Sequence, residues 1–406
     1  MSRYVAYNPE QDWLLPPSIA DELGDNHLSL FLHRMVERLD LGAFEAGSSE
    51  EGRPGYPPQL LLKVWLYAYC VGVTSSRRLE QRIHEDLGFR LLAGNLKPDH
   101  WTLNEFRRKH PRGLNDIFTQ VVEAARKMGM GRLGRVAVDS TRVAANASPD
   151  RSDTLEKLRK ERTQIRRRIR RWQKECDRQN DDAPGTKAVP VAQWQQRLEE
   201  IPRQMEQLRK SEQKRGSRTD PESRYLRKRG GYVLGFTAEV AVADDHLIVA
   251  QRVHQKTTDN QSAAEMAEAV EQECGERPEL LVADSGYYNM EQIQKIEARG
   301  IETVVPDRLM ARELAGGARA PDMNARQRRR TPGLQEHREK MRQPATAAHY
   351  RRRKSVVEPV FGTLKHQRGM RHFRRRGLIG VSTEWALATT AYNLTRMFNV
   401  ARATGF

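Results

Sequence analysis

Two short apolar runs, far apart in the sequence, each end in an aspartate, and they constrain the fold more than any other feature. Residues 135–138 lead into Asp139, and residues 280–283 lead into Asp284. Such runs are typical of buried strands, and ligands of α/β sheets gather at the carboxyl ends of strands. If the two strands are neighbours, both carboxylates come within reach of one ion. An aspartate that closes an apolar run can also be an ordinary turn residue, so the runs alone leave that alternative open.

Further strands and helices alternate after residue 231. This alternation predicts an α/β fold in which a mixed sheet is flanked by helices. The expected elements are strands over Tyr232–Val242 and Leu247–Val253, helices over Ser262–Glu273 and Met290–Arg299, and a strand over Ile301–Pro306. Residues 307–348 are rich in Arg, Gly, Ala and Pro, which predicts a mostly irregular segment with one short helix near Gln335–Arg342.

A long helical segment separates Asp139 from the later strands. Apolar residues recur at alternating spacings of three and four from Leu155 to Cys176 and again from Val191 to Leu208, which is the coiled-coil pattern. A turn-rich linker over residues 179–185 joins them, so we expect an antiparallel helical hairpin within residues 151–215. Its outer face is crowded with arginine, and this face is either a DNA-binding surface or an ordinary solvated one.

The sequence of residues 1–130 predicts a helical domain that is separate from the α/β part of the chain. Its helices carry basic side chains on their outer faces, among them Arg107 and Arg108, which suggests a helix-turn-helix-like DNA-binding module. A plain helical bundle with solvated arginines is the alternative. The expected helices cover Ser29–Leu41, Gln59–Val71, Arg77–Leu87 and Leu103–His110, and the second is apolar nearly all round, as a buried helix would be.

The stretch from His349 to Gly377 holds a single carboxylate, Glu358, among many lysines and arginines. Apolar residues at 357, 360, 361 and 364 predict an amphipathic helix, on which Glu358 and Lys365 lie two turns apart on nearly the same face. Spacing alone leaves two interpretations. Glu358 either balances local charge or is a metal-binding carboxylate beside a phosphate-binding strip.

Composition points to a soluble protein with a polyanionic partner. The net charge is +17 at pH 7, which favours nucleic acid over a membrane surface. The longest apolar-rich run, residues 60–73, is too short to span a bilayer, and residues 1–18 do not resemble a signal peptide. Three widely spaced cysteines suit reduced thiols, not a disulfide frame or a zinc site. We therefore expect a cytoplasmic protein associated with the nucleoid.

Three acids from separate elements suit magnesium chemistry. Mg²⁺ prefers oxygen ligands and usually takes one or two carboxylates, and two such ions about 4 Å apart catalyse phosphoryl transfer. Asp139, Asp284 and Glu358 would suffice to hold a pair of Mg²⁺ ions, for which Mn²⁺ can substitute. The histidines lie in neither an HExxH nor a CxxC motif, which argues against zinc, and the absence of a GxxxxGK[ST] loop argues against an ATP-driven enzyme.

Several motifs resemble those of bacterial insertion-sequence transposases of the DDE type. They are AVDSTRVAANAS around Asp139, DPESR at Asp220–Arg224, VADSGYYN around Asp284, and YRRRKSVVEPVFGTLKHQRGMRHFRRRG around Glu358. PPQLLLKVWLYAYCVG and PDHWTLNEFRRKH resemble the helical N-terminal domain of these enzymes, and ALATTAYNLTRMF resembles their closing helix. The resemblance covers nearly the whole chain, and the Glu358 motif is its most specific part.

The resemblance implies an RNase H-like catalytic domain whose metal-binding triad is Asp139, Asp284 and Glu358. It also assigns Tyr350, Arg353 and Lys365 to a signature that holds DNA phosphates near the cut. In the commoner spacing an arginine stands four residues before the glutamate, where this chain has Lys354. The implied domains are a DNA-binding domain over 1–130, a catalytic domain over 131–150 and 216–406, and the hairpin insertion over 151–215.

The function that follows is DNA transposition. The enzyme would bind double-stranded DNA at the inverted-repeat ends of a transposon, cut there, and join the freed 3′-hydroxyl to target DNA. Both steps are in-line displacements at phosphorus without a covalent protein intermediate. Related enzymes act as dimers on paired ends. The alternatives are a catalytically silent or repurposed DNA-binding protein and a nuclease of the same fold.

Overall fold

The computed structural model describes residues 18–45, 55–179, 188–211, 213–228, 230–321 and 333–404. Residues 180–185 of the predicted hairpin linker lie outside this part, as do residues 322–332 of the predicted irregular segment. None of the described helices is long and apolar enough to cross a membrane.

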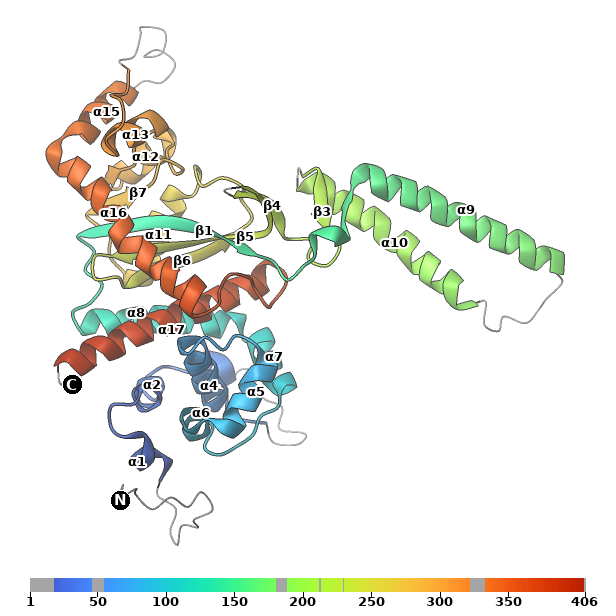
Figure 1. Ribbon diagram of the computed structural model, residues 1–406, viewed down its shortest axis with the longest axis horizontal. Helices are drawn as coiled ribbons and strands as arrows, with labels where there is room; N and C mark the ends of the chain where they lie inside the picture. Colours follow the sequence, from blue (N-terminus) through green and yellow to red (C-terminus); the bar gives the residue numbers. More distant parts are fainter. Residues whose placement is uncertain are drawn as a thin grey trace, which may run out of the picture.

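Within the described residues, six strands form the central sheet (Figure 1). β1 lies in its middle, with β5 antiparallel on one side and β7 parallel on the other. β6 pairs with β5, β8 extends the sheet beyond β7, and β4 pairs with the first residues of β5. The strands are β1 (Arg135–Ala144), β4 (Arg224–Lys228), β5 (Gly231–Ala243), β6 (Ile248–His254), β7 (Leu280–Ala283) and β8 (Glu302–Val304).

The order β6–β5–β1–β7–β8 is that of an RNase H-like sheet. β5 runs antiparallel to both of its neighbours, β6 and β1, and β7 and β8 run parallel to β1. Helices connect the parallel part, because parallel neighbours need crossover connections. The predicted fold class, an α/β fold with a mixed sheet flanked by helices, is therefore confirmed. The connecting helices are α11 (Ala263–Cys274), between β6 and β7, and α12 (Met290–Glu297), between β7 and β8.

The two faces of the sheet carry different helices. Asp139 pairs with Val240, whereas Glu239 pairs with Ser140, so Asp139 and Glu239 point to opposite faces. Arg353 of α16 (Pro344–Gly362) contacts Asp139, and Ser262, which precedes α11, contacts Glu239. Thus α16 packs on β1 at the Asp139 face, and α11 packs on β5 and β6 at the Glu239 face (Figure 1). The predicted short helix is present as α15 (Leu334–Arg342), and α13 (Arg308–Leu314) was not predicted.

The N-terminal helices share one hydrophobic core with the sheet. The helix α4 is buried on nearly all sides, as predicted, and packs against the closing helix α17 (Leu378–Thr404). α17 also packs on α8 and β6, so buried apolar residues run without a break from α2 to the sheet. The helices are α1 (Ile19–Leu23), α2 (Leu28–Val36), α3 (Gly42–Glu45), α4 (Pro58–Cys70), α5 (Ser76–Glu85), α6 (Leu87–Leu92), α7 (His100–Lys109) and α8 (Pro111–Lys127).

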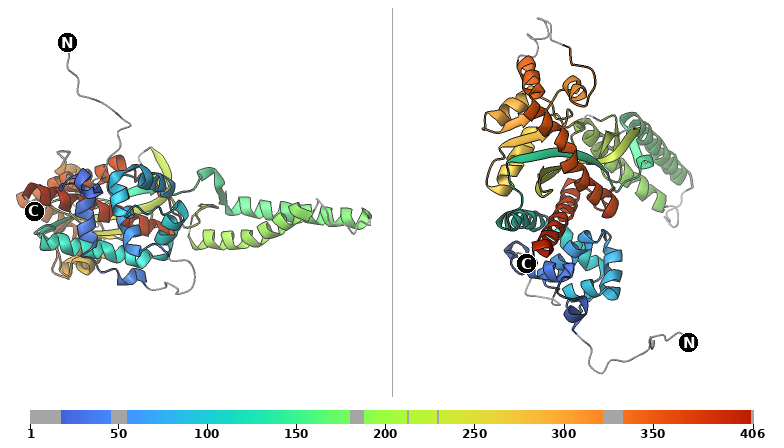
Figure 2. Two further views of the ribbon diagram at one scale, coloured as in Figure 1. Left: turned by 90° about the horizontal axis from the view of Figure 1, so that it is seen from below. Right: turned by 60° about the vertical axis from the view of Figure 1, so that its left-hand side comes forward.

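The predicted helical hairpin projects from the body (Figures 1 and 2). Its helices are α9 (Leu155–Gln179) and α10 (Ala188–Lys210), and Leu158, Ile165, Ile201 and Met205 form the buried seam between them. At its base, β2 (Ser152–Thr154) pairs with β3 (Arg215–Ser217). The hairpin therefore enters and leaves the sheet domain through a two-stranded ribbon between β1 and β4.

Gly235 of β5 lies so close to the backbone of β1 that we expect its replacement to cause a large loss of stability. A Cβ atom added at Gly235 would lie 2.0 Å from the carbonyl oxygen of Val143, and a backbone atom cannot move aside cheaply. We expect Gly235→Ala to lower the free energy of unfolding by about 3 kcal/mol. Gly134→Ala is the control, because its Cβ would meet only Glu279 Oε2, at 3.7 Å. Equal stability of the two variants in urea unfolding would contradict this prediction.

Candidate active site

The sheet brings Asp139 and Asp284 together. β1 and β7 are parallel neighbours in which Val138 pairs with Ala283, so the two aspartates occupy adjacent positions one residue further on. Asp284 immediately follows β7, as predicted. Asp139 lies within β1 and not at its end, because β1 continues to Ala144 along its partner β5. This register makes the two strands neighbours, which is the condition on which the predicted proximity of the two carboxylates depends.

The carboxylate of Asp139 is held by two donors. Arg353 Nη1 donates to Oδ2 at 2.9 Å, and the backbone N–H of Ser140 donates to Oδ1 at 2.8 Å. Burial raises the pKa of Asp139 to about 6, and the charge of Asp284 adds to that rise, while Arg353 and the Ser140 N–H oppose it. The ordinary pKa of this group is 3.8. The site therefore disfavours two negative charges unless a cation compensates them.

The loop that follows β7 fixes the Asp284 side chain. Its Oδ1 accepts the N–H of Gly286 at 2.8 Å, which closes a tight turn. A Cβ atom at position 286 would lie 2.9 Å from that same oxygen and 3.7 Å from Asp259 Oδ2. The glycine in VADSGYYN is thus explained by close approach, because any side chain there would push against the carboxylates.

Lys365 and Tyr350 lie on the Asp139 face of the sheet. The ammonium of Lys365 donates to the hydroxyl of Thr141, which shares that face because it stands two residues from Asp139 on β1. Burial lowers the pKa of Lys365, and Lys228 and Arg142 add to the effect. Burial also raises the pKa of the Tyr350 hydroxyl, and the charges of Asp284 and Asp139 raise it further. The Tyr350 hydroxyl therefore lies in the electric field of both aspartates, and the Lys365 ammonium lies in that of Asp139.

Glu358 and Lys354 are exposed on α16. Within the part of the chain that the structure describes, neither side chain forms a hydrogen bond or an ion pair. The ligand atoms of Asp139, Asp284 and Glu358 do not all lie within 4.8 Å of one another. The structure thus places the two aspartates on neighbouring strands, but the carboxylate of Glu358 does not lie close to both of them. The role of Glu358 stays a prediction.

A π-helical segment, Thr363–Gln367, follows α16 and contains Lys365. Its hydrogen bonds span five residues instead of four, which shifts Lys365 around the helix axis. The predicted amphipathic helix is therefore present, with Val357, Val360 and Leu364 buried, but it is α-helical only as far as Gly362, and Lys365 lies in the π-helical part. The shift is accompanied by the contact between Lys365 and Thr141 beside Asp139.

The prediction that Arg107 lies on an exposed basic face is wrong. Its side chain is buried, with the guanidinium 3.7 Å from the centre of the Trp65 ring and a hydrogen bond of 3.0 Å to the Tyr69 hydroxyl. The flat guanidinium stacks on the indole, so this arginine ties α7 to α4 inside the core. Arg108 is exposed as expected and donates to both carboxylate oxygens of Glu105, at 2.7 and 2.6 Å.

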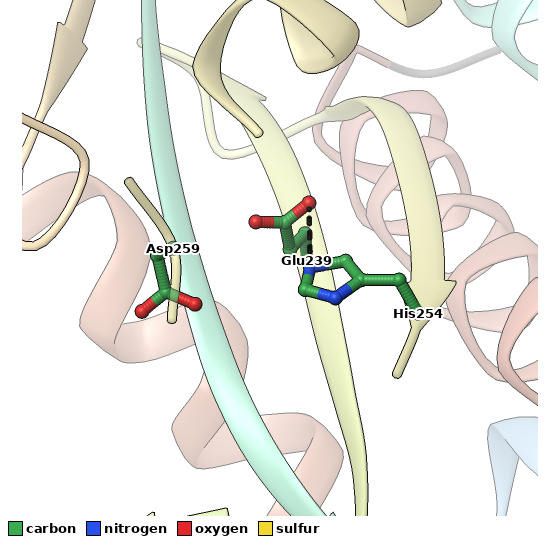
Figure 3. Close-up of side chains that lie close together, drawn as sticks. All are labelled: Glu239, His254 and Asp259. Atoms are coloured by element: carbon green, nitrogen blue, oxygen red, sulfur yellow. Dashed lines mark ion pairs between the residues drawn. The ribbon is translucent and has the colours of Figure 1, made fainter. Parts of the chain in front are cut away.

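A second polar cluster, on the opposite face of the sheet, was missed in the sequence (Figure 3). Glu239 is fully buried, and its Oε1 accepts from the hydroxyls of Ser262 at 2.7 Å and Tyr287 at 2.9 Å. His254 Nε2 lies 3.2 Å from Glu239 Oε2. Within the described residues, Glu239, His254 and Asp259 form the one group of three or more acids, histidines or cysteines whose ligand atoms all lie within 4.8 Å of one another. The sequence contained one indication of this cluster, namely an acidic residue, Glu239, within the otherwise apolar run of residues 231–243.

The hydrogen bonds of this cluster argue against a metal site. Nδ1 of His254 accepts the backbone N–H of Lys256 at 3.1 Å, so in the neutral ring the proton is on Nε2, the atom that faces Glu239. A metal on Nε2 would require a proton on Nδ1, where a donor already points. Both oxygens of Asp259 accept from Arg142, each at 3.1 Å. We therefore interpret the cluster as a buried network that supports Tyr287 and, through it, the Asp284 loop.

Two family models match the chain. One, described as "Transposase DDE domain", matches residues 135–394, which is more than half of the chain. The other, described as "Transposase domain (DUF772)", matches residues 18–109. No curated protein and no solved structure matches.

Proposed function

The chain belongs to the transposase DDE domain family, and we propose that it cuts DNA at the ends of an insertion sequence and joins the freed ends to target DNA. The observation that supports this best is the pairing of Asp139 and Asp284 by the β1–β7 register. Two carboxylates on neighbouring parallel strands, with Arg353 and Lys365 beside them, suit a reaction at a phosphate group.

The aspartate pair fits a divalent cation, which the family normally uses. Carboxylate oxygens are the ligands that Mg²⁺ and Mn²⁺ prefer, and burial, to which the charge of Asp284 adds, raises the pKa of Asp139, so a bound cation would stabilise its ionised form. Asp139 and Asp284 would hold the ion, and Glu358 would join them by a rearrangement of α16 or of its own rotamer. A bound ion supplies charge neutralisation on the phosphate oxygens.

The basic side chains around the pair would position the DNA. Arg353 now neutralises Asp139, and a cation on the aspartates would release it for a phosphate oxygen. Lys365 stands beside Thr141 on the same face, and the Tyr350 hydroxyl lies near both acids. The exposed ammonium of Lys354 would contact phosphates further along the strand. These four residues orient the scissile phosphate, and none of them is required to exchange a proton with it.

The rest of the chain would select and hold the substrate. The helices over residues 18–109, which match a transposase domain of their own, are proposed to bind the inverted-repeat ends, with Arg108 among the contacts. Cutting and joining two ends requires two active sites held together, so we propose that the protein forms a homodimer when it is assembled on DNA.

A paired cleavage and joining assay tests the proposed function. The substrate is a labelled duplex that carries the DNA flanking the coding region, and a plasmid serves as the target. With Mg²⁺ we expect a cut at the element end and then joined products. Binding without a cut would indicate a DNA-binding protein without catalysis, and a cut without joining would indicate a nuclease. Either outcome would contradict the proposal.

The raised pKa of Asp139, about 6, predicts that binding of a divalent ion weakens in acid. The carboxyl group must lose its proton to become a ligand, so it is available above about pH 7 and is increasingly blocked below its pKa. We expect the affinity for Mn²⁺, followed by the electron paramagnetic resonance of the free ion, to fall by up to about tenfold per pH unit below pH 6. In Asp139→Asn this part of the pH dependence should vanish. An affinity that stays constant down to about pH 5 would contradict the prediction.

A further inference from the structure

The helix α9 carries cations along the side that faces away from α10. Leu158 and Ile165 face α10 in the buried seam. At 100° per residue, the opposite side of α9 presents a different set of positions. We call this set the arm stripe: Arg159, Lys160, Arg167, Arg170, Arg171 and Lys174, all of which are exposed.

Most of the arm stripe is not neutralised by the protein. Two acids of α9 lie on or beside this side: Glu156 pairs with Lys160 at 2.6 Å, and Glu175 is exposed and forms no ion pair among the described residues. Among the residues that the structure describes, the other five cations have no ion-pair or hydrogen-bond partner for their side chains. Repulsion among five unpaired cations is unfavourable in the free protein, and an external polyanion would relieve it.

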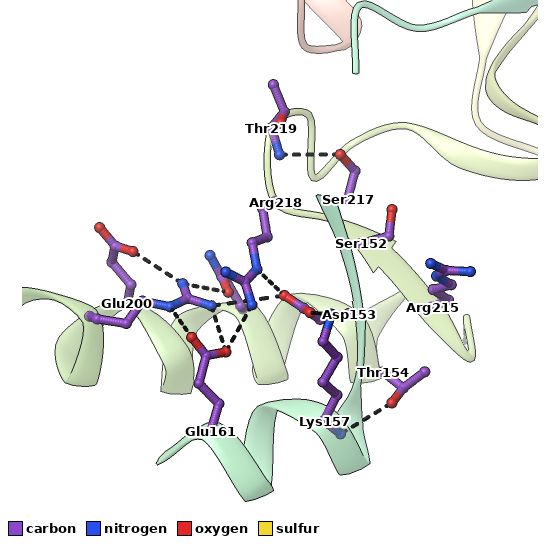
Figure 4. A network of polar contacts seen from close by, with 12 residues as sticks. Ser152, Asp153, Thr154, Lys157, Glu161, Glu200, Arg215, Ser217, Arg218 and Thr219 are labelled. Atoms are coloured by element: carbon purple, nitrogen blue, oxygen red, sulfur yellow. Dashed lines mark hydrogen bonds and ion pairs between the residues drawn. The ribbon is translucent and has the colours of Figure 1, made fainter. Parts of the chain in front are cut away.

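The acids at the base of the hairpin are engaged elsewhere (Figure 4). Asp153 of β2 pairs with Arg218 and, at 2.9 Å, with Lys157. Glu161 of α9 pairs at 2.9 Å with both Arg197 of α10 and Arg218. These contacts join both helices to the ribbon that leads into the sheet, and Asp153 is only 3% exposed. The network joins the hairpin to the ribbon and engages Asp153 and Glu161, so neither of these two acids is available to the arm stripe.

The length of the arm stripe suits a DNA backbone. From Arg159 to Lys174 the helix rises about 22 Å. One strand of B-DNA presents a phosphate about every 3.4 Å along the helix axis, so this distance corresponds to about six phosphates. Five unpaired cations over that distance can contact most of them. α9 lies on an arm that projects from the body (Figures 1 and 2), where a duplex can approach it without obstruction from the sheet domain.

We propose that the arm stripe binds the phosphate backbone of double-stranded DNA, away from the cut and independently of base sequence. This inference rests on the proposed function, because it assumes that DNA is the substrate. A second copy of this chain is a poor alternative occupant, since it would bring the same stripe and the same net charge of +17. The arm thus enlarges the electrostatic footprint of the enzyme on DNA that flanks the active site.

Two matched double variants test the proposal. Arg167→Gln with Arg170→Gln removes two charges from the arm stripe. Arg203→Gln with Arg209→Gln removes two exposed charges from α10 of the same hairpin, which controls for net charge. DNA affinity is measured without divalent ions over a series of salt concentrations, on end DNA and on scrambled DNA. Equal melting curves establish that both variants are folded.

The salt dependence of DNA affinity distinguishes the two double variants. Each phosphate contact contributes about 0.9 to the slope of log affinity against log salt. We expect the α9 double variant to lose about 1.8 from that slope on both DNAs, and the α10 double variant to lose less than about 0.5. Equal losses in the two variants, or an unchanged slope in the α9 variant, would overturn the proposal. The assay involves no cleavage, so its failure is distinct from a failure of the proposed catalytic function.

Discussion

Asp284→Asn should lower the rate of DNA strand cleavage by about 10³-fold or more while binding to end DNA stays within about twofold of the unmodified protein. The amide keeps the size of the side chain and its contact with the Gly286 N–H, but it lacks the charge that a divalent ion requires. Cleavage of labelled end DNA, measured beside a binding titration of the same substrate, separates the two effects.

The control for this prediction is Asp244→Asn. Asp244 lies in the turn between β5 and β6, where it pairs with Arg135 at the start of β1 and, at 3.9 Å, with Arg352 of α16, so its loss removes a charge without removing a proposed metal ligand. Cleavage by the Asp244 variant should remain near the level of the unmodified protein. Full cleavage by the Asp284 variant would remove Asp284 from the catalytic residues.

Glu239→Leu should lower the free energy of unfolding by about 3 kcal/mol, which is the second large effect that we expect. Its carboxylate is fully buried and accepts the hydroxyls of Ser262 and Tyr287. Leucine leaves the Tyr287 hydroxyl without an acceptor inside the core, which costs about 1–3 kcal/mol, and removes the acid that faces His254 Nε2. The Ser262 hydroxyl can still donate to the backbone oxygen of Asp259 at 2.8 Å. Urea unfolding measures the change. Glu239→Gln retains an acceptor oxygen and should recover most of the lost stability.

Two adjacent tyrosines provide a matched test of the same network. Tyr287→Phe removes the hydroxyl that binds Glu239, whereas Tyr288→Phe removes a buried hydroxyl that has no hydrogen-bond partner among the described residues. Tyr287→Phe should be destabilising, and Tyr288→Phe should be neutral or slightly stabilising. The reverse order of stabilities would contradict the proposed support of the Asp284 loop by Glu239.

Much of the fold follows from patterns that depend only on local chemistry. The apolar runs before Asp139 and Asp284 predict β1 and β7, because a strand buried in a sheet needs apolar side chains on both faces. The alternating spacing of apolar residues predicts α9 and α10, because helices that bury one stripe pair along it. The pairing of the two aspartates required only that their strands be neighbours.

The features that were missed depend on contacts between distant residues. A basic helix face does not reveal that Arg107 stacks on Trp65, because that contact joins two helices. The local sequence pattern predicts an α-helix through Lys365, where the structure has a π-helical segment and a contact to Thr141 of β1, which is distant in the sequence. The partners of Glu239 come from three separate elements. Helix α7 begins three residues earlier than predicted because Asp99 accepts the Thr102 N–H at 2.7 Å and caps it.

The central claim, that Asp139 and Asp284 hold a divalent ion during DNA cleavage, can be tested by replacing Mg²⁺ with Fe²⁺. Hydroxyl radicals generated at bound iron cut the polypeptide beside the ion, and the fragments locate the site. We predict cuts next to residues 139 and 284, with a further cut next to residue 358 when end DNA is bound. Cuts near Glu239 and His254, with none near Asp139 or Asp284, would contradict this assignment.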